Sequence, residues 1–189
     1  MRATWVPPAG RFHVQHFHEL VAWCEIGLYR GVLDERAQLA ERIPQLESSM
    51  LLRVESVRAQ YHYLRGRLAL AGFLPQDEAQ RAARKLHKEN SPLAPTFALV
   101  IDAGALALRD PQQAATLYEK AAEISERVDM RAIAAACRWR AADLRRDPAK
   151  RSAAQAELAA LGVRDAKRMC NLLVPTRKST SEPDEPSVS

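Results

Sequence analysis

The sequence predicts an all-α fold in which about four helical hairpins stack into an α-α superhelix, followed by a short C-terminal helix. Apolar residues recur at spacings of three and four along almost the whole chain up to Leu173, and the β-branched alternation typical of strands is almost absent. In addition, Gly31, Gly72, Asp110 and Asp147 interrupt this pattern 41, 38 and 37 residues apart. A period of this length indicates repeats built from helix pairs.

The first predicted hairpin contains helices over residues 13–30 and 34–43. Five apolar side chains of the first helix lie along one face, Val14, Phe17, Val21, Cys24 and Leu28. Gly31 should end this helix, and Pro44 should end the next, because a proline disfavours the helical conformation in the residue before it.

The later helices are delimited by glycine and by Asp-Pro pairs. They are predicted over residues 49–71, 76–89, 92–109, 111–128, 130–146, 148–161 and 165–173. In Asp110-Pro111 and Asp147-Pro148, the aspartate can accept hydrogen bonds from unpaired backbone N–H groups at a helix start. The proline fills the first helical position, where its missing N–H costs nothing.

The segment after Asp110-Pro111 carries a pattern of small and aromatic residues. Ala114, Tyr118 and Ala121 are four and three residues apart and resemble the second helix of a tetratricopeptide repeat. The segment "LVAWCEIGLYRG" is similar to the first helix and turn of such a repeat, although the period here exceeds that family's usual length of about 34 residues. This divergent resemblance implies a repeat domain over residues 13–174 after an N-terminal extension of residues 1–12.

The segments "HVQHFHEL", "GLYRG", "RIPQLESSMLLRVESVR" and "RMCNLLVP" resemble, in this order, the repeat region at the carboxyl end of multidomain bacterial serine/threonine protein kinases. The resemblance implies a regulatory or scaffolding segment of a signalling protein. The chain itself contains neither the H-R-D and D-F-G motifs of a kinase nor a Walker A lysine. We therefore expect a non-catalytic protein-interaction module without cofactor, and we assign no catalytic residue.

Three of the five histidines lie within "HVQHFHEL". On a helix, His13 and His16 are neighbours, but His18 points about 140° to 160° away from them, so the three cannot bind one ion. The pattern favours a histidine beside the packed face of the first helix. A pH-sensitive contact is the alternative, and no metal site is predicted because no further ligand motif accompanies the cluster.

A partner-binding groove is predicted from Arg58, Arg65, Asp102 and Arg138. Arg58 and Arg65 are seven residues apart on one helix face, and Arg138 belongs to the corresponding helix two hairpins later, so the three could hold an acidic peptide. The competing interpretation is that they are exposed or form pairs within the chain. Asp102 lies in an apolar helix and should either pair with an arginine such as Arg65 or Arg140 or line the groove.

The formal net charge of +5 keeps a nucleic-acid-associated regulator open as the alternative function. Acids alternate with the arginines, as in "RVESVR", so a protein or peptide partner, or another domain of a larger chain, is favoured. Self-association through the first helix is also predicted, because four residues add apolar surface beyond its packed stripe: Trp5, Phe12, Leu20 and Trp23.

The rest of the composition predicts a cytoplasmic protein. Cys24, Cys137 and Cys170 lack disulfide or metal-ligand spacing and fall in apolar helical patterns, so buried thiols are expected. The chain shows no apolar secretion signal and no apolar run long enough to span a membrane. Residues 175–189 are polar and contain prolines, which predicts a disordered tail.

Overall fold

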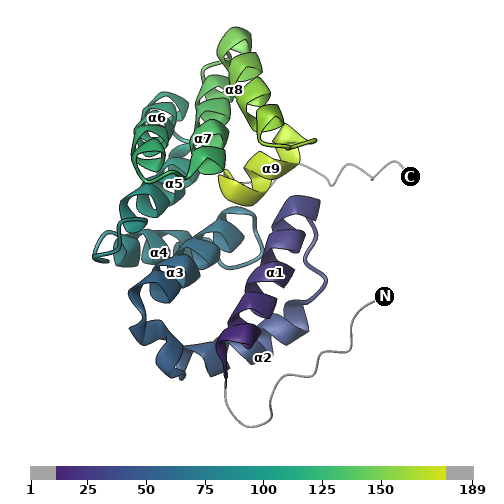
Figure 1. The fold of residues 1–189 in the computed structure, drawn as a ribbon, viewed down its shortest axis with the longest axis vertical. Coiled ribbons are helices and arrows are strands. Elements are labelled where there is room, and N and C mark those ends of the chain that lie inside the picture. Colours follow the sequence, from purple (N-terminus) through teal and green to yellow (C-terminus); the bar gives the residue numbers. More distant parts are fainter. Residues whose placement is uncertain (1–11, 178–189) are drawn as a thin grey trace.

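The computed structural model describes residues 12–177, and every regular element within this range is a helix (Figure 1). The elements are α1 (Val14–Arg30), α2 (Arg36–Glu47), the 3₁₀ helix η1 (Met50–Arg53), α3 (Glu55–Leu70), α4 (Asp77–Leu86), α5 (Ala94–Leu106), α6 (Pro111–Arg127), α7 (Arg131–Leu144), α8 (Pro148–Ala160) and α9 (Ala166–Leu173). The predicted all-α class is confirmed for these residues. The predicted extension lies outside them except for Phe12, and of the predicted tail only residues 175–177 are described.

The helices from α3 to α8 pack in chain order, each against the next (Figure 1). In addition, α3 contacts α5, which places the first helices of two successive pairs side by side. Gly66 of α3 permits this approach, since a Cβ on it would lie 2.7 Å from Cδ1 of Ile101 on α5. This part of the chain agrees with the predicted succession of helix pairs.

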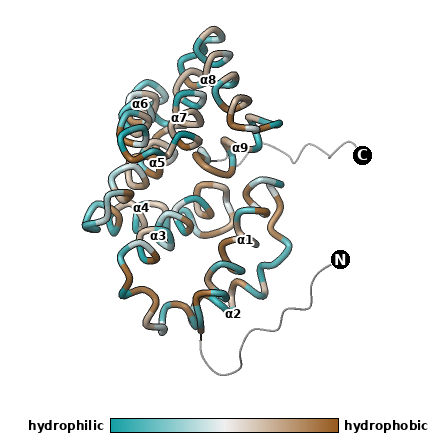
Figure 2. The backbone as a smooth tube through the Cα atoms, viewed as in Figure 1, coloured by the Kyte–Doolittle hydropathy of each residue, from teal (hydrophilic) through white to brown (hydrophobic). Residues whose placement is uncertain are grey.

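The two ends of the described chain depart from an open stack of hairpins. α1 contacts α2 only slightly and packs mainly against α9 and α3. After α8 the chain turns back, so that α9 lies against both α7 and α1 (Figure 1). α9 is hydrophobic over much of its length (Figure 2), and Cys170 within it is fully buried. The last helix of the described chain therefore packs against the first.

Local chemistry fixes several helix starts as predicted. The Asp110 carboxylate accepts a hydrogen bond from the backbone N–H of Gln113 at 2.9 Å. Asp147 caps α8 in the same way through Lys150, at 3.0 Å. Asp165 does so for α9. These caps satisfy N–H groups that have no partner within the helix.

Two predicted boundaries are wrong. Pro44 does not end the second helix but lies inside α2, because the fully buried Leu46 packs with Phe17 and Tyr61 and holds the next turn in place. The predicted long helix over residues 49–71 is interrupted at Val54, whose backbone is extended, so η1 precedes α3. At Pro44, contacts with distant residues outweigh the local preference.

The core extends across the stack through small and aromatic side chains. Ala114, Tyr118 and Ala121 of α6 are each 0% exposed, which confirms that this predicted stripe is packed. α3 is buried on most of its sides and contributes to all three hydrophobic clusters of the described residues. It therefore joins the α1–α2 end of the molecule to the stack of α4 to α8.

Candidate functional site

Arg58, the first of the predicted groove residues, is held by a carboxylate of its own chain. Its Nε and Nη2 atoms donate to the two carboxylate oxygens of Glu89 at 2.6 and 2.7 Å, and its Nη1 donates to the Leu52 carbonyl at 2.9 Å. The hydrogen bond from Arg58 lowers the pKa of Glu89, so the pair stays charged. Arg58 thus fastens the start of α3 to the segment after α4.

Arg65 joins three helices. Its Nη2 lies 2.6 Å from Oε2 of Glu78 on α4, and its Nη1 lies 2.9 Å from Oε1 of Glu47 on α2. The same Nη1 donates to the Tyr61 hydroxyl at 2.8 Å. The guanidinium is therefore already engaged within the chain.

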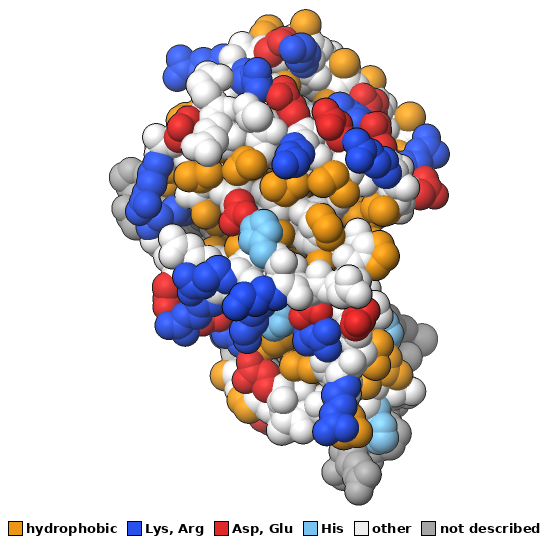
Figure 3. Space-filling view, turned by 90° about the vertical axis from the view of Figure 1, so that its left-hand side faces the viewer, with side chains coloured by type: hydrophobic (Ala, Val, Ile, Leu, Met, Phe, Trp, Pro, Cys, Tyr) orange, Lys and Arg blue, Asp and Glu red, His pale blue; other side chains and the backbone are white. Residues whose placement is uncertain are grey.

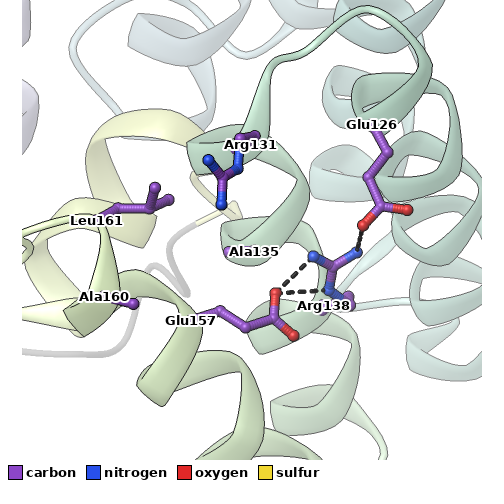
Figure 4. A pocket seen from close by; sticks show the side chains of 7 residues that line it. All are labelled: Glu126, Arg131, Ala135, Arg138, Glu157, Ala160 and Leu161. Carbon is purple, nitrogen blue, oxygen red and sulfur yellow. Dashed lines mark hydrogen bonds and ion pairs between the residues drawn. The ribbon is translucent and has the colours of Figure 1, made fainter.

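Arg138 lies in a pocket of about 570 Å³ between α6, α7 and α8 (Figure 4). Its Nη1 donates to Glu126 at 2.7 Å, and its Nε donates to Glu157 at 3.0 Å. Arg131 also lines this pocket, so two arginines face two glutamates. The pocket carries no excess charge that would select an acidic ligand.

Asp102 does not pair with an arginine, so the predicted partner is wrong. Its Oδ2 lies 2.7 Å from Nε2 of His87, just after α4, and its side chain is 36% exposed. Arg65 is held by glutamates, and Arg140 contacts the last helix instead. The neighbours of Asp102 in the sequence are apolar and therefore gave no sign that its side chain lies on the partly exposed side of α5. The four predicted residues thus lie in separate pairings along the stack and do not meet in one site.

A second pocket, of about 460 Å³, lies between α3 and α4 and has an excess of positive charge. Its lining residues are Glu47, Tyr61, His62, Arg65, Glu78, Arg81, Ala82, Arg84, Lys85 and Lys88. Five cationic side chains against two carboxylates leave a net charge of +3. Figure 3 shows lysine and arginine side chains gathered near mid-height of this face.

Four of these cations belong to α4 or the residues just after it, and we call three of them, Arg84, Lys85 and Lys88, the α4 basic surface. All three are exposed and form no ion pair within residues 12–177, whereas Arg81 is paired with Asp77 and Glu78. Sequence reasoning missed this surface. The available signal was the spacing of positions 81, 84, 85 and 88, which places four cations on one helix face.

His62 forms part of the wall of this pocket and is 6% exposed. Burial, and after it the neighbouring charges of Lys85, Arg58 and Arg65, lower the pKa of His62 from 6.5 to about 4, against the opposing effect of Glu89. The imidazole is therefore neutral near pH 7. It adds a hydrogen-bonding group to the pocket without adding charge.

We expect the His62→Gln variant to lose less stability than the parent chain when the pH falls from 6.5 to about 4. In the unfolded chain His62 takes up a proton near pH 6.5, but in the folded chain it does so only near pH 4. Protonation therefore favours the unfolded state across this window, and stability is lost as pH falls. Melting temperatures at pH 7, 5.5 and 4.5 measure the difference. Parallel pH profiles for the two chains would contradict the assignment.

One histidine of the cluster, His16, and all three cysteines are buried. The backbone N–H of His13 donates to Nδ1 of His16 at 2.9 Å, and His16 is buried, whereas His18 is exposed. Within residues 12–177 no group of three or more metal-ligating side chains comes together. Cys24, Cys137 and Cys170 are buried free thiols, as predicted, and burial raises the pKa of Cys24 and of Cys170 to about 12.

The apolar surface predicted for self-association is largely covered. Leu20 is 1% exposed, and Phe12 and Trp23 are partly buried against the hydrophobic clusters. Trp5 lies outside the described residues. The apolar side chains that α1 does expose are Val14 and Ile26, 42% and 52% exposed. Leu20, and much of Phe12 and Trp23, are therefore not part of the exposed surface through which self-association was predicted.

Comparison of the chain with protein-family models, curated proteins and solved structures finds no match. Among residues 12–177, none of the helices combines the length and apolar character that crossing a bilayer requires. The surfaces of the molecule are therefore what indicate its function.

Proposed function

We propose that the chain is a non-catalytic protein-interaction module of packed helix pairs that binds an acidic segment of a partner protein on the α4 basic surface. One observation carries the proposal. Arg58, Arg65 and Arg138 are neutralised within the chain, but Arg84, Lys85 and Lys88 border an open pocket and have no carboxylate partner among residues 12–177. Cations grouped on one face attract acidic ligands and steer their approach.

The shape and composition of the α4 basic surface favour a peptide over a nucleic acid. From position 81 to position 88 a helix rises about 10 Å, which reaches few phosphates compared with the roughly six to ten that strong DNA binders contact. Tyr61, the pocket's aromatic residue, is 2% exposed and offers no face for base stacking.

The sequence supports a particular kind of partner and a cellular compartment. The resemblance to the repeat regions of bacterial serine/threonine kinases supports a partner within a signalling assembly, either a separate protein or another domain of a larger chain. The cytoplasm is the compartment we propose, because the buried free thiols suit a reducing environment.

We expect the triple variant Arg84→Glu, Lys85→Glu, Lys88→Glu to bind an acidic peptide roughly 10- to 100-fold more weakly than the parent chain. Three exposed ion pairs of about 0.5–1 kcal/mol each account for this loss. The probe is a fluorescein-labelled twelve-residue peptide rich in Asp and Glu, and the measurement is fluorescence anisotropy at low and moderate salt. Binding should weaken as salt rises.

A matched control reverses three exposed cations elsewhere. The variant Lys120→Glu, Arg127→Glu, Arg131→Glu changes the net charge by the same amount on α6 and α7, where these residues form no ion pair within the described chain. It should retain most of the affinity. Equal losses in both variants would contradict a defined site. Tighter binding of a single-stranded DNA or RNA of similar length would replace the peptide proposal with the nucleic-acid alternative.

A further inference from the structure

The last described residues of the chain lie against one face of the helix stack as a peptide ligand would. We call this the docking face and define it by the residues that contact the chain end: Tyr63 and Arg67 of α3, Gly104 of α5, Tyr118 of α6 and Arg140 of α7. The C-terminal segment, residues 170–177, comprises the end of α9 and four residues beyond it. These contacts involve neither the α4 basic surface nor its pocket.

The docking face binds this segment through hydrogen bonds to its main chain. The hydroxyl of Tyr63 donates to the Leu173 carbonyl, and the hydroxyl of Tyr118 lies 3.4 Å from the Pro175 carbonyl. The N–H of Arg177 donates to the Gly104 carbonyl at 3.1 Å. The docking face thus binds main-chain groups of the last turn of α9 and of the irregular residues after it, which have no partner within the helix.

Gly104 gives the segment the room it needs. A Cβ at this position would lie 2.5 Å from the Pro175 carbonyl oxygen and 2.5 Å from Cδ1 of Leu70. The end of the Leu70 side chain can move aside at little cost, but the backbone oxygen of Pro175 cannot move without displacing the segment. Glycine is therefore required here by the docked chain more than by the packing of α3 on α5.

Two buried arginines on the docking face lack a buried carboxylate. Arg67 and Arg140 are 4% and 7% exposed. Nη1 of Arg67 donates to the Leu172 carbonyl at 3.0 Å, and its Nη2 lies 3.4 Å from Glu25, whose side chain is 42% exposed. The Nε of Arg67 is buried and has no hydrogen-bond partner within the described residues.

Arg140 has neutral acceptors only. Its Nε donates to the Val174 carbonyl at 3.3 Å, and its Nη2 donates to Oδ1 of Asn171 at 3.1 Å. It forms no ion pair with any residue in the described range. Its guanidinium also lies 5.3 Å from the centre of the Trp139 ring. A buried cation whose hydrogen bonds go to neutral oxygens keeps much of its desolvation cost, whereas a carboxylate at the same place would form a charge-assisted hydrogen bond.

We propose that the docking face is a binding site for a peptide that ends a helix and continues without regular structure, that residues 170–177 occupy it within the chain, and that its ligand is a partner segment carrying a carboxylate where this chain has Asn171. Such a segment matches the buried arginines better than the resident one and displaces it. Binding at this face is thus in competition with the chain's own end. The α4 basic surface remains available in both states.

The test uses the full chain and three labelled peptides with the sequence of residues 166–177, carrying Asn, Asp or Lys at position 171. We expect the Asp peptide to bind about tenfold more tightly than the Asn peptide, which is the gain from a neutral to a charge-assisted hydrogen bond. The Lys peptide should bind more weakly than either. In the Arg140→Gln chain the preference for Asp over Asn should fall to about twofold or less.

Variants of position 171 in the chain itself provide the matched pair. Asn171→Asp should hold the resident segment more tightly and weaken binding of the Asp peptide about tenfold, whereas Asn171→Lys should loosen the segment and strengthen binding. Circular dichroism establishes that each chain is folded, and Asn171→Asp serves alone if Asn171→Lys unfolds. Equal affinities for the Asp and Asn peptides would overturn the proposal, as would the absence of binding to the parent chain at about 1 mM peptide. Because the triple reversal on the α4 basic surface should leave this binding unchanged, failure here is distinguishable from failure of the proposed function.

Discussion

Tyr118→Ala is expected to lower the free energy of unfolding by about 3–5 kcal/mol, the usual cost of removing a buried aromatic ring. Tyr118 is 0% exposed and lies in the main hydrophobic cluster, among residues from α3 to α9. Its removal leaves a cavity where consecutive helices meet. Since domains of this size are stable by about 5–15 kcal/mol in total, the variant should be close to unfolding at physiological temperature.

Tyr118→Phe separates the ring from its hydroxyl. The phenylalanine keeps the packing and loses only the contact with the Pro175 carbonyl, so the loss should be about 0.5–1.5 kcal/mol. Urea denaturation of both variants, followed by circular dichroism, gives the comparison. A loss in Tyr118→Ala no larger than that in Tyr118→Phe would show that the ring does not hold the stack together.

Leu46→Ala is expected to cost about 2–5 kcal/mol and to act locally, on α2. Leu46 is fully buried against Phe17 and Tyr61, and the other buried side chain of α2 is Leu39. The helix contacts α1 and η1 only slightly. Pro44 already removes one backbone hydrogen bond from this helix. Without the leucine side chain, α2 should open before the rest of the molecule does.

Hydrogen exchange measured by mass spectrometry distinguishes local from global opening. In Leu46→Ala the amides of α2 should exchange rapidly, while those of α6 and α7 keep their protection. Glu41→Ala, an exposed change on the same helix, should leave α2 within about 0.5 kcal/mol of the parent. A uniform loss of protection across all helices would contradict the view that Leu46 stabilises α2 locally.

The two proposed surfaces differ in how they meet a ligand. The α4 basic surface is exposed and should act through long-range attraction, which salt screens. The docking face is buried beneath the C-terminal segment and should act through short-range, desolvated contacts. A partner with two acidic stretches could bind both surfaces. Once one stretch is bound, the other would bind at the effective concentration that the first contact sets.

Features that the sequence determined by itself are those with local causes. The 3.6-residue periodicity gave the helices, and Asp110 and Asp147 capped the helices that they were predicted to start. The small-aromatic-small stripe of α6 predicted its buried face, because side chains four and three residues apart share a side of any helix. The basic spacing around Arg84 was equally visible, and only its significance depended on which other cations were neutralised.

The tertiary structure decided everything that depends on residues distant in the chain. Tyr63 meets Leu173 across 110 positions, and no periodicity specifies that return of α9. The same holds for Asp102, which pairs with His87 where an arginine was expected, and for Pro44, which remains helical because Leu46 is buried. Helix formation is encoded over a few residues, but the choice of partner for a charge or a helix face is a competition among all of them, and only the packed molecule resolves it.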